Sequence, residues 1–184
     1  MAASVGILRI TGAFGSQSTT NITGANTVAN AQDVHEATAT LSSNPVRIPS
    51  AGSNYSYWVT TRLAATTAPA GTINNIRWYT DGSDNFGTGV STIAAQAQTY
   101  VQATGTAGTS GNLLTTLSHT GLSAAPVMPF TYIQGSPLAI TGSFTFGAAT
   151  GQFGNYMVYQ LAVGTTASPG ATSQLTFTWL YDET

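Results

Sequence analysis

Several segments of the chain alternate apolar and polar residues one by one. In LTFTWLY, residues 175–181, every odd-numbered residue is Leu, Phe, Trp or Tyr, and both Thr residues are even-numbered. Successive side chains of a β-strand point to opposite faces, so this period of two predicts a strand with one buried face. PLAITGSFTF (137–146) and NYSYWVTTRL (54–63) predict strands in the same way. Shorter strand candidates are residues 5–11, 37–41, 46–49, 73–80 and 128–133.

The segment NYMVYQLAV, residues 155–163, is apolar on both of its faces. An antiparallel strand of this kind is expected to be covered on both sides. We expect it to pair with 175–181 in one sheet, through a turn at Pro169-Gly170. Its second face has no partner that the sequence supplies, so Tyr156, Val158 and Ala162 are candidates for an interface with a neighbouring subunit.

The strand candidates are separated by Gly-rich turn sequences such as GTAGTSGN and GTTASPGAT. This spacing, over 184 residues, predicts an all-β, single-domain antiparallel β-sandwich, jelly-roll-like and with little helix, that spans residues 1–184. The polar segment 12–32 is expected to be a long loop or an arm on a neighbour. Residues 93–102, IAAQAQTYVQ, suit a helix or a strand equally well.

Charge is unusually scarce. Asp, Glu, Lys and Arg make up 5% of the chain, against about 25% in an ordinary globular protein, and Lys is absent. Four scattered Arg residues give no basic row for phosphates, so no nucleic-acid partner is expected. No apolar run is long enough to cross a bilayer, and MAASVGILRI lacks the features of a signal peptide, so no membrane association is expected. The absence of Cys excludes disulfides and thiol chemistry.

The densest polar cluster is DVHE, with Asp33, His35 and Glu36. On a strand, Asp33 and His35 would share a face and could hold a metal or act as an acid–base pair. Only one further His exists in the chain, at position 119. We therefore interpret the cluster as a solvated surface turn rather than a site.

The segment DGSDNFGTG is similar to a calcium-binding loop, with Asp81, Ser83 and Asn85 at the first, third and fifth positions. The sixth position is Phe86, where such a loop requires Gly, and the twelfth is Thr92, where it requires Glu. These three residues are weak metal candidates, and a hairpin turn is the favoured interpretation.

No catalytic set is recognisable, since no Ser stands in a G-x-S-x-G context and no pair of acids is placed for glycoside hydrolysis. We therefore expect no enzyme activity and no cofactor. The aromatic residues could form a platform for sugars, although packing in the core is the favoured interpretation. They are Trp58, Trp78, Trp179, Tyr55, Tyr57 and Tyr79.

Scarce charge and many short Thr-, Ala- and Gly-rich strands suit a protein that is covered by neighbours, because interfaces are depleted in Lys, Glu and Asp. The closing stretch YQLAVGTTASPGATSQLTFTWLYDET and the stretch NYSYWVTTRLAATTAPAGTINNIRWYTDG resemble β-sandwich virion structural proteins of tailed bacteriophages. The resemblance implies a capsid decoration (cement) protein that stabilises the major capsid lattice. It further implies a homo-oligomer such as a trimer, the major capsid protein or another virion protein as partner, and assembly into the virion in the host cytoplasm.

Other functions stay open at this point. A jelly-roll capsid subunit or a tail-tube subunit would share the same Thr-rich, charge-poor composition. An extracellular filament subunit and a carbohydrate-binding module are further alternatives from different classes. The sequence contains no diagnostic motif that separates them.

Overall fold

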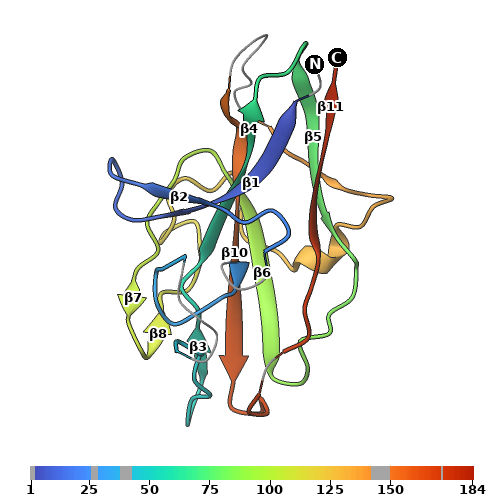
Figure 1. Ribbon diagram of the computed structural model, residues 1–184. Coiled ribbons are helices and arrows are strands. Elements are labelled where there is room, and N and C mark those ends of the chain that lie inside the picture. Colours follow the sequence, from blue (N-terminus) through green and yellow to red (C-terminus); the bar gives the residue numbers. More distant parts are fainter. Residues whose placement is uncertain (1–2, 26–28, 38–42, 142–149, 171) are drawn as a thin grey trace.

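The protein is described by a computed structural model that covers residues 3–25, 29–37, 43–141, 150–170 and 172–184. These ranges contain eleven β-strands, the short 3-10 helix η2 (Pro129–Thr131) and no α-helix (Figure 1). All strand pairs are antiparallel, and two sheets enclose the main core. The prediction of an all-β, sandwich-like fold is therefore confirmed. No helix in the described part of the chain is long and apolar enough to span a bilayer.

The larger sheet is built around β10, the longest strand. Its order is β2 (Ser18–Asn21), β1 (Ser4–Thr11), β4 (Val59–Thr67) and β10 (Gly151–Gly164), followed by β3 (Ser53–Tyr55) and β6 (Val90–Ala97), which both pair with β10. Ala162 and Val163 pair with β3 and with β6 at the same time, so these two strands flank β10 on opposite sides.

The smaller sheet has three strands, in the order β11 (Phe177–Glu183), β5 (Ile73–Thr80) and β9 (Leu138–Ala139). β11 and β5 are long, whereas β9 has only two residues. The short strands β7 (Gly105–Thr106) and β8 (Ser110–Gly111) form a separate hairpin. The 3-10 helix η2 (Pro129–Thr131) precedes β9.

The main core lies between the two sheets. β5 contributes Ile73, Ile76 and Trp78, and the larger sheet contributes Val59 and Phe153 among others; each is at most 1% exposed. A second apolar cluster covers the other face of the larger sheet, where Val158 packs with Trp58 and Leu114. Both faces of β10 are covered, as its sequence predicted, and the second cover comes from the same chain.

The predicted pairing of 156–163 with 175–181 is wrong. These segments belong to β10 and β11, which lie in different sheets. They face each other across the core, where the rings of Tyr159 and Phe177 meet with centroids 4.9 Å apart. Alternation identifies the buried face of a strand but not its hydrogen-bonded neighbour, and the sequence therefore left the pairing undetermined.

Other strand predictions have mixed outcomes. Residues 5–11 and 73–80 are strands, and 54–63 divides into β3 and β4 at Ser56–Trp58. The predictions for 46–49 and 128–133 are wrong, because the first is irregular and the second contains η2, which Pro129 begins. Within 93–102, β6 continues to Ala97, so the strand alternative is correct there. The segment 12–32 includes β2. Residues 38–41 and 142–146 lie outside the described ranges.

Candidate functional site

The outer edge of β11 is the surface that we assign as the candidate functional site. The direction of its backbone groups follows from β5. Thr80 donates its N–H to the carbonyl of Tyr132, and the carbonyl of Ile76 accepts from Ile140, so the even-numbered residues from 76 to 80 turn their backbone groups toward β9 and the segment before it. Residues of antiparallel strands turn their backbone groups to alternate sides. Arg77 and Tyr79 therefore face β11.

Leu180 and Thr178 lie opposite Arg77 and Tyr79, so the backbone groups of these even-numbered residues face β5. The odd-numbered residues Phe177 and Trp179 consequently point their N–H and C=O groups away from the sheet. No hydrogen bond from these groups to another part of the described chain is present. β11 is thus an open edge that can accept a further strand.

A β-bulge interrupts the pairing of β5 with β11. Asn75 and Ile76 of β5 lie together opposite Tyr181, since the register shifts between Leu180 and Asp182. Asn75 is the non-glycine residue with a positive φ, at 48°, among those that the structure describes. Asn tolerates the left-handed region better than most residues. The bulge turns the side chains of Asn75, Arg77 and Asp182 toward one another.

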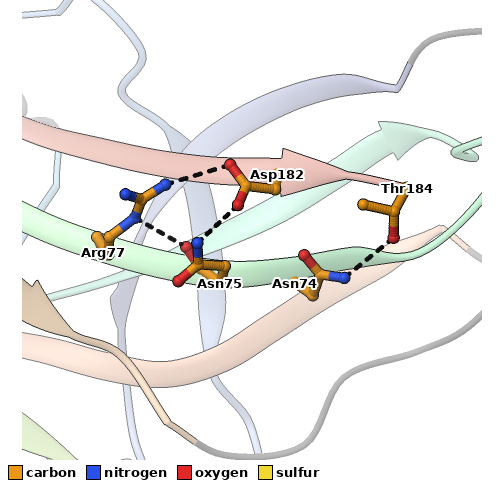
Figure 2. Close-up of polar contacts among 5 residues, drawn as sticks. All are labelled: Asn74, Asn75, Arg77, Asp182 and Thr184. Carbon is orange, nitrogen blue, oxygen red and sulfur yellow. Dashed lines mark hydrogen bonds and ion pairs between the residues drawn. The ribbon is translucent and has the colours of Figure 1, made fainter.

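Figure 2 shows these polar contacts between β5 and β11. Arg77 donates from Nη2 to Asp182 Oδ1 at 3.2 Å and from Nε to the carbonyl of Asn75 at 3.2 Å. The side-chain amide of Asn75 donates to Asp182 Oδ2 at 2.6 Å, and that of Asn74 donates to Thr184 Oγ1 at 3.0 Å. This network fixes the end of β11 to β5 and pairs the negative charge of Asp182 with the positive charge of Arg77.

Glu183, the other acid of β11, is also held within the chain. Its carboxylate accepts the backbone N–H of Ala3 at 2.8 Å and that of Ala70 at 2.9 Å. These two hydrogen bonds hold the pKa of Glu183 below its ordinary value. The acids of β11 therefore have partners inside the protein and do not present free carboxylates at the edge.

The side chains of β11 are incompletely buried on both faces. Phe177, Trp179 and Tyr181 pack against the main core but stay half-buried, whereas Trp78 on the central strand is 1% exposed. On the outer face Leu180 is 39% exposed. The edge thus combines free backbone groups with apolar surface that the chain itself leaves uncovered.

The interpretation of DVHE as a solvated turn is wrong for Asp33, which is 2% exposed. Its backbone N–H donates to Asn44 O and its carbonyl accepts from Gly108 N–H, each at 3.2 Å, and these bonds hold it beneath the surface. His35 is half-buried, and Glu36 is exposed. The described residues contain no group of three or more His, Asp or Glu side chains that could hold a metal.

Both His residues are neutral near pH 7. Burial, followed by the charge of Arg9, lowers the pKa of His35 to about 4. His119 is fully buried against Trp58, with ring centroids 5.6 Å apart, and burial lowers its pKa. Neither ring nitrogen of His119 has a hydrogen-bond partner among the described residues. His119 thus packs in the interior against Trp58.

The weak metal candidates Asp81, Ser83 and Asn85 lie on an exposed turn that follows β5. The Asp81 side chain accepts the backbone N–H of Ser83 at 3.0 Å, which is an ordinary use of Asp in a turn. The segment is therefore a turn, but its interpretation as a hairpin is wrong, because it joins β5 to β6 and these strands lie in different sheets.

The structure places the proposed aromatic platform largely in the interior. Trp58 and Trp78 are each 1% exposed and belong to different apolar clusters, and Tyr57 is 8% exposed. Tyr55 and Tyr79 are half-buried. The interpretation as core packing therefore holds for Trp58, Trp78 and Tyr57, whereas Tyr55 and Tyr79 belong to neither cluster.

Val158 cannot serve as an interface residue, because it is fully buried in the second apolar cluster of its own chain. Tyr156 is half-buried under Arg62, whose guanidinium carbon lies 4.5 Å from the ring centroid. Ala162 is half-buried as well. For Tyr156 and Ala162 an interface role stays a prediction.

A shallow apolar hollow of about 90 Å³ lies between β6 and the segment that precedes β9. Its walls include Ala94, Ala125, Val127 and Leu138. Its lining also includes Gln96, Ser123 and Tyr132, but the side chain of Gln96 is already hydrogen-bonded to Ala139 and Thr141, and we assign the hollow no binding role.

No protein-family model matches the chain, and neither the search of curated proteins nor that of solved structures gave a match. Sequence reasoning missed the edge of β11 as a surface. The alternation of 175–181 indicated the strand, and the unpaired edge follows only from the order of strands within the sheet.

Proposed function

We propose that the protein is a structural subunit of a tailed-bacteriophage virion, and that it acts as a capsid decoration (cement) protein that stabilises the major capsid lattice. The observation that carries the proposal is the makeup of the exposed surface. Only four of the ten charged residues are exposed, namely Glu36, Arg47, Asp81 and Asp84. Eight large apolar side chains are exposed in the described chain: Phe14, Ile48, Leu113, Leu117, Val127, Met128, Ile133 and Leu180.

A surface with more exposed apolar side chains than charges favours contact with other protein. Charged groups keep proteins soluble and monomeric, whereas interfaces exclude Lys, Glu and Asp from their centres. Of the six remaining charges, two are buried (Arg9 and Asp33), two pair with each other (Arg77 and Asp182), and two are hydrogen-bonded to backbone groups of the chain (Arg62 and Glu183). The proposal therefore rests on physical chemistry of the surface as well as on the resemblance of the sequence to virion β-sandwich proteins.

The alternatives remain distinguishable by experiment. A jelly-roll capsid subunit, a tail-tube subunit and an extracellular filament subunit share the same surface chemistry but assemble into shells, tubes and filaments. A carbohydrate-binding module is less well supported, because two of the three Trp residues are buried in the core.

Light scattering and negative-stain electron microscopy of the purified protein test the proposal. We expect small closed oligomers, such as dimers or trimers. Tubes or filaments would favour the corresponding alternatives, and a monomer at every concentration would contradict an assembly role. The position in the virion is then tested by immunogold labelling of phage particles from the source lysate, with pre-immune serum as the control. Gold on the head supports the decoration role, and gold on the tail or on no particle contradicts it.

A further inference from the structure

We propose that β11 pairs with β11 of a second copy of this chain, antiparallel and across a two-fold axis that passes beside Leu180. Two three-stranded sheets would then join into one continuous sheet of six strands. The inference rests on the proposed assembly role only in taking a second copy as the partner, and it specifies the surface, the register and the symmetry.

The register follows from the direction of the backbone groups. The odd-numbered residues of β11 point N–H and C=O groups outward, so hydrogen-bonded pairs across the axis must join odd-numbered residues to odd-numbered residues. A two-fold axis perpendicular to the sheet keeps the core face of each copy on the same side. Centring the axis at Leu180 satisfies both conditions and uses the whole strand, Phe177–Glu183.

In this register the apolar surface of the edge is covered. The two Leu180 side chains, each 39% exposed in the single chain, lie directly opposite each other on the outer face. On the core face Trp179 of each copy lies opposite Tyr181 of the other, and both residues are half-buried in the single chain. Aromatic pairs across antiparallel strands are among the more favourable cross-strand contacts.

The charges of the strand favour an antiparallel copy. Asp182 lies opposite Thr178 of the other copy, and Glu183 lies opposite Phe177, so no like charges face each other. A parallel copy in register would place Asp182 beside Asp182, which is unfavourable. Both carboxylates already have partners within their own chain, which reduces their repulsion further.

Site-specific crosslinking with Leu180→Cys tests the inference, because the natural chain has no Cys. Directly opposed residues of a pair without mutual hydrogen bonds have Cα atoms about 4.5 Å apart, within the range of about 4.4–6.8 Å found in disulfides. With copper–phenanthroline as the oxidant, Leu180→Cys is expected to form a dimer of twice the monomer mass on a non-reducing gel. Dithiothreitol should return it to the monomer.

Thr178→Cys is the matched control, since it lies on the same face of the same strand. In the proposed register, position 178 of one copy lies four residues along the strand from position 178 of the other. This distance of about 13 Å is too long for a disulfide. The control is therefore expected to remain monomeric on the gel under the same oxidant. Equal crosslinking of both variants would overturn the proposed register.

Leu180→Asp provides a second, non-covalent test. It places two carboxylates opposite each other at the axis, and we expect the protein to elute as a smaller species with an unchanged far-ultraviolet circular dichroism spectrum. An oligomer by light scattering whose Leu180→Cys variant does not crosslink would overturn β11 pairing and leave the assembly role intact. A monomeric natural protein with no crosslinking would overturn both.

Discussion

The rings of Tyr159 and Phe177 meet edge to face across the interior, with centroids 4.9 Å apart and planes inclined by 74°. Phe177 also lies 5.2 Å from the ring of Trp78, centroid to centroid. Tyr159 belongs to the larger sheet, whereas Phe177 and Trp78 belong to the smaller one. The contact between the sheets thus runs through an aromatic cluster at the start of β11.

Replacing Trp78 by Ala is expected to lower the free energy of unfolding by about 3–5 kcal/mol, the usual cost of truncating a buried large aromatic side chain. Trp78 is 1% exposed and contacts Phe177 and Tyr132. Urea denaturation measures the change. Trp179→Ala is the matched comparison and should cost clearly less in the monomer, because Trp179 is half-buried. Equal losses would contradict the burial of Trp78 at the centre of the sheet.

Gln160 is expected to be essential to stability although its side chain is polar. It is fully buried; its amide nitrogen donates to the carbonyls of Ser56 and Asn112 at 2.7 and 2.8 Å, and its oxygen accepts Leu114 N–H at 2.7 Å. Gln160→Leu leaves these three backbone groups unpaired, each at a cost of about 1–3 kcal/mol. We expect a loss of at least about 2 kcal/mol by urea denaturation.

Gln98→Leu is the control for this substitution, since Gln98 is exposed and the chemical change is the same. Its effect should stay within about 0.5 kcal/mol. A similar loss for both variants would show that the hydrogen bonds of Gln160 are not the cause.

The positive φ of Asn75 gives a matched pair of substitutions. Asn75→Gly and Asn75→Ala both remove the hydrogen bond to Asp182 (Figure 2). At φ 48° Ala carries a steric cost that Gly does not, so the Ala variant should be less stable than the Gly variant by about 1 kcal/mol. Thermal melts of the two variants measure the difference, and indistinguishable values would argue against a left-handed residue in the bulge.

Stability is expected to fall as the pH is lowered from 7.5 to 5. Burial lowers the pKa values of His119 and of His35, the latter to about 4, whereas an unfolded His titrates near pH 6.5. Below about pH 6.5 the unfolded chain therefore binds protons that the folded chain does not, and acidification favours unfolding down to about pH 4. The melting temperature at the two pH values measures the effect.

His119→Phe should reduce this pH dependence, since it removes one of the two titrating groups and retains a ring against Trp58. A melting temperature that is equal at pH 7.5 and pH 5 in the natural protein would contradict the assignment of both His residues as neutral in the folded state.

Several strands were predictable from the sequence. Residues 73–80 form β5 within the predicted limits, and 5–11 differs from β1 by one residue. Two predictions failed at Pro: the segment 46–49 ends with Pro49, and 128–133 contains Pro129 at the start of η2. Pro lacks the N–H that a strand ladder needs, so apolar residues beside it are a weak indication of a strand.

The sequence did not predict which elements pack against one another. Val158 was a candidate for contact with another subunit because nothing nearby in the sequence could cover it. The covering residue Leu114 lies more than forty positions away, and its backbone N–H is fixed by the side chain of Gln160. Gln160 is a polar residue that points into the interior and bonds to buried backbone groups, so it interrupts the alternation of apolar and polar residues. Its role could be recognised only from the three-dimensional structure.

The buried position of Asp33 has a related explanation. Its neighbours His35 and Glu36 are polar, and a polar run indicates a solvated loop. The backbone of Asp33 nevertheless bonds to Asn44 and Gly108, which fixes the loop against distant segments. Long-range backbone hydrogen bonds of loops leave no periodic trace in the sequence.

The unequal edges of the smaller sheet limit how many copies it can recruit. β9 has two residues among those described, whereas β11 has seven, of which the odd-numbered ones point their backbone groups outward. In the proposed two-fold contact each β11 covers the other, so pairing through β11 ends at two copies and does not by itself propagate into a cross-β fibre. Under the proposed decoration role, copies held close together on a particle surface would therefore pair through β11 in twos rather than in chains.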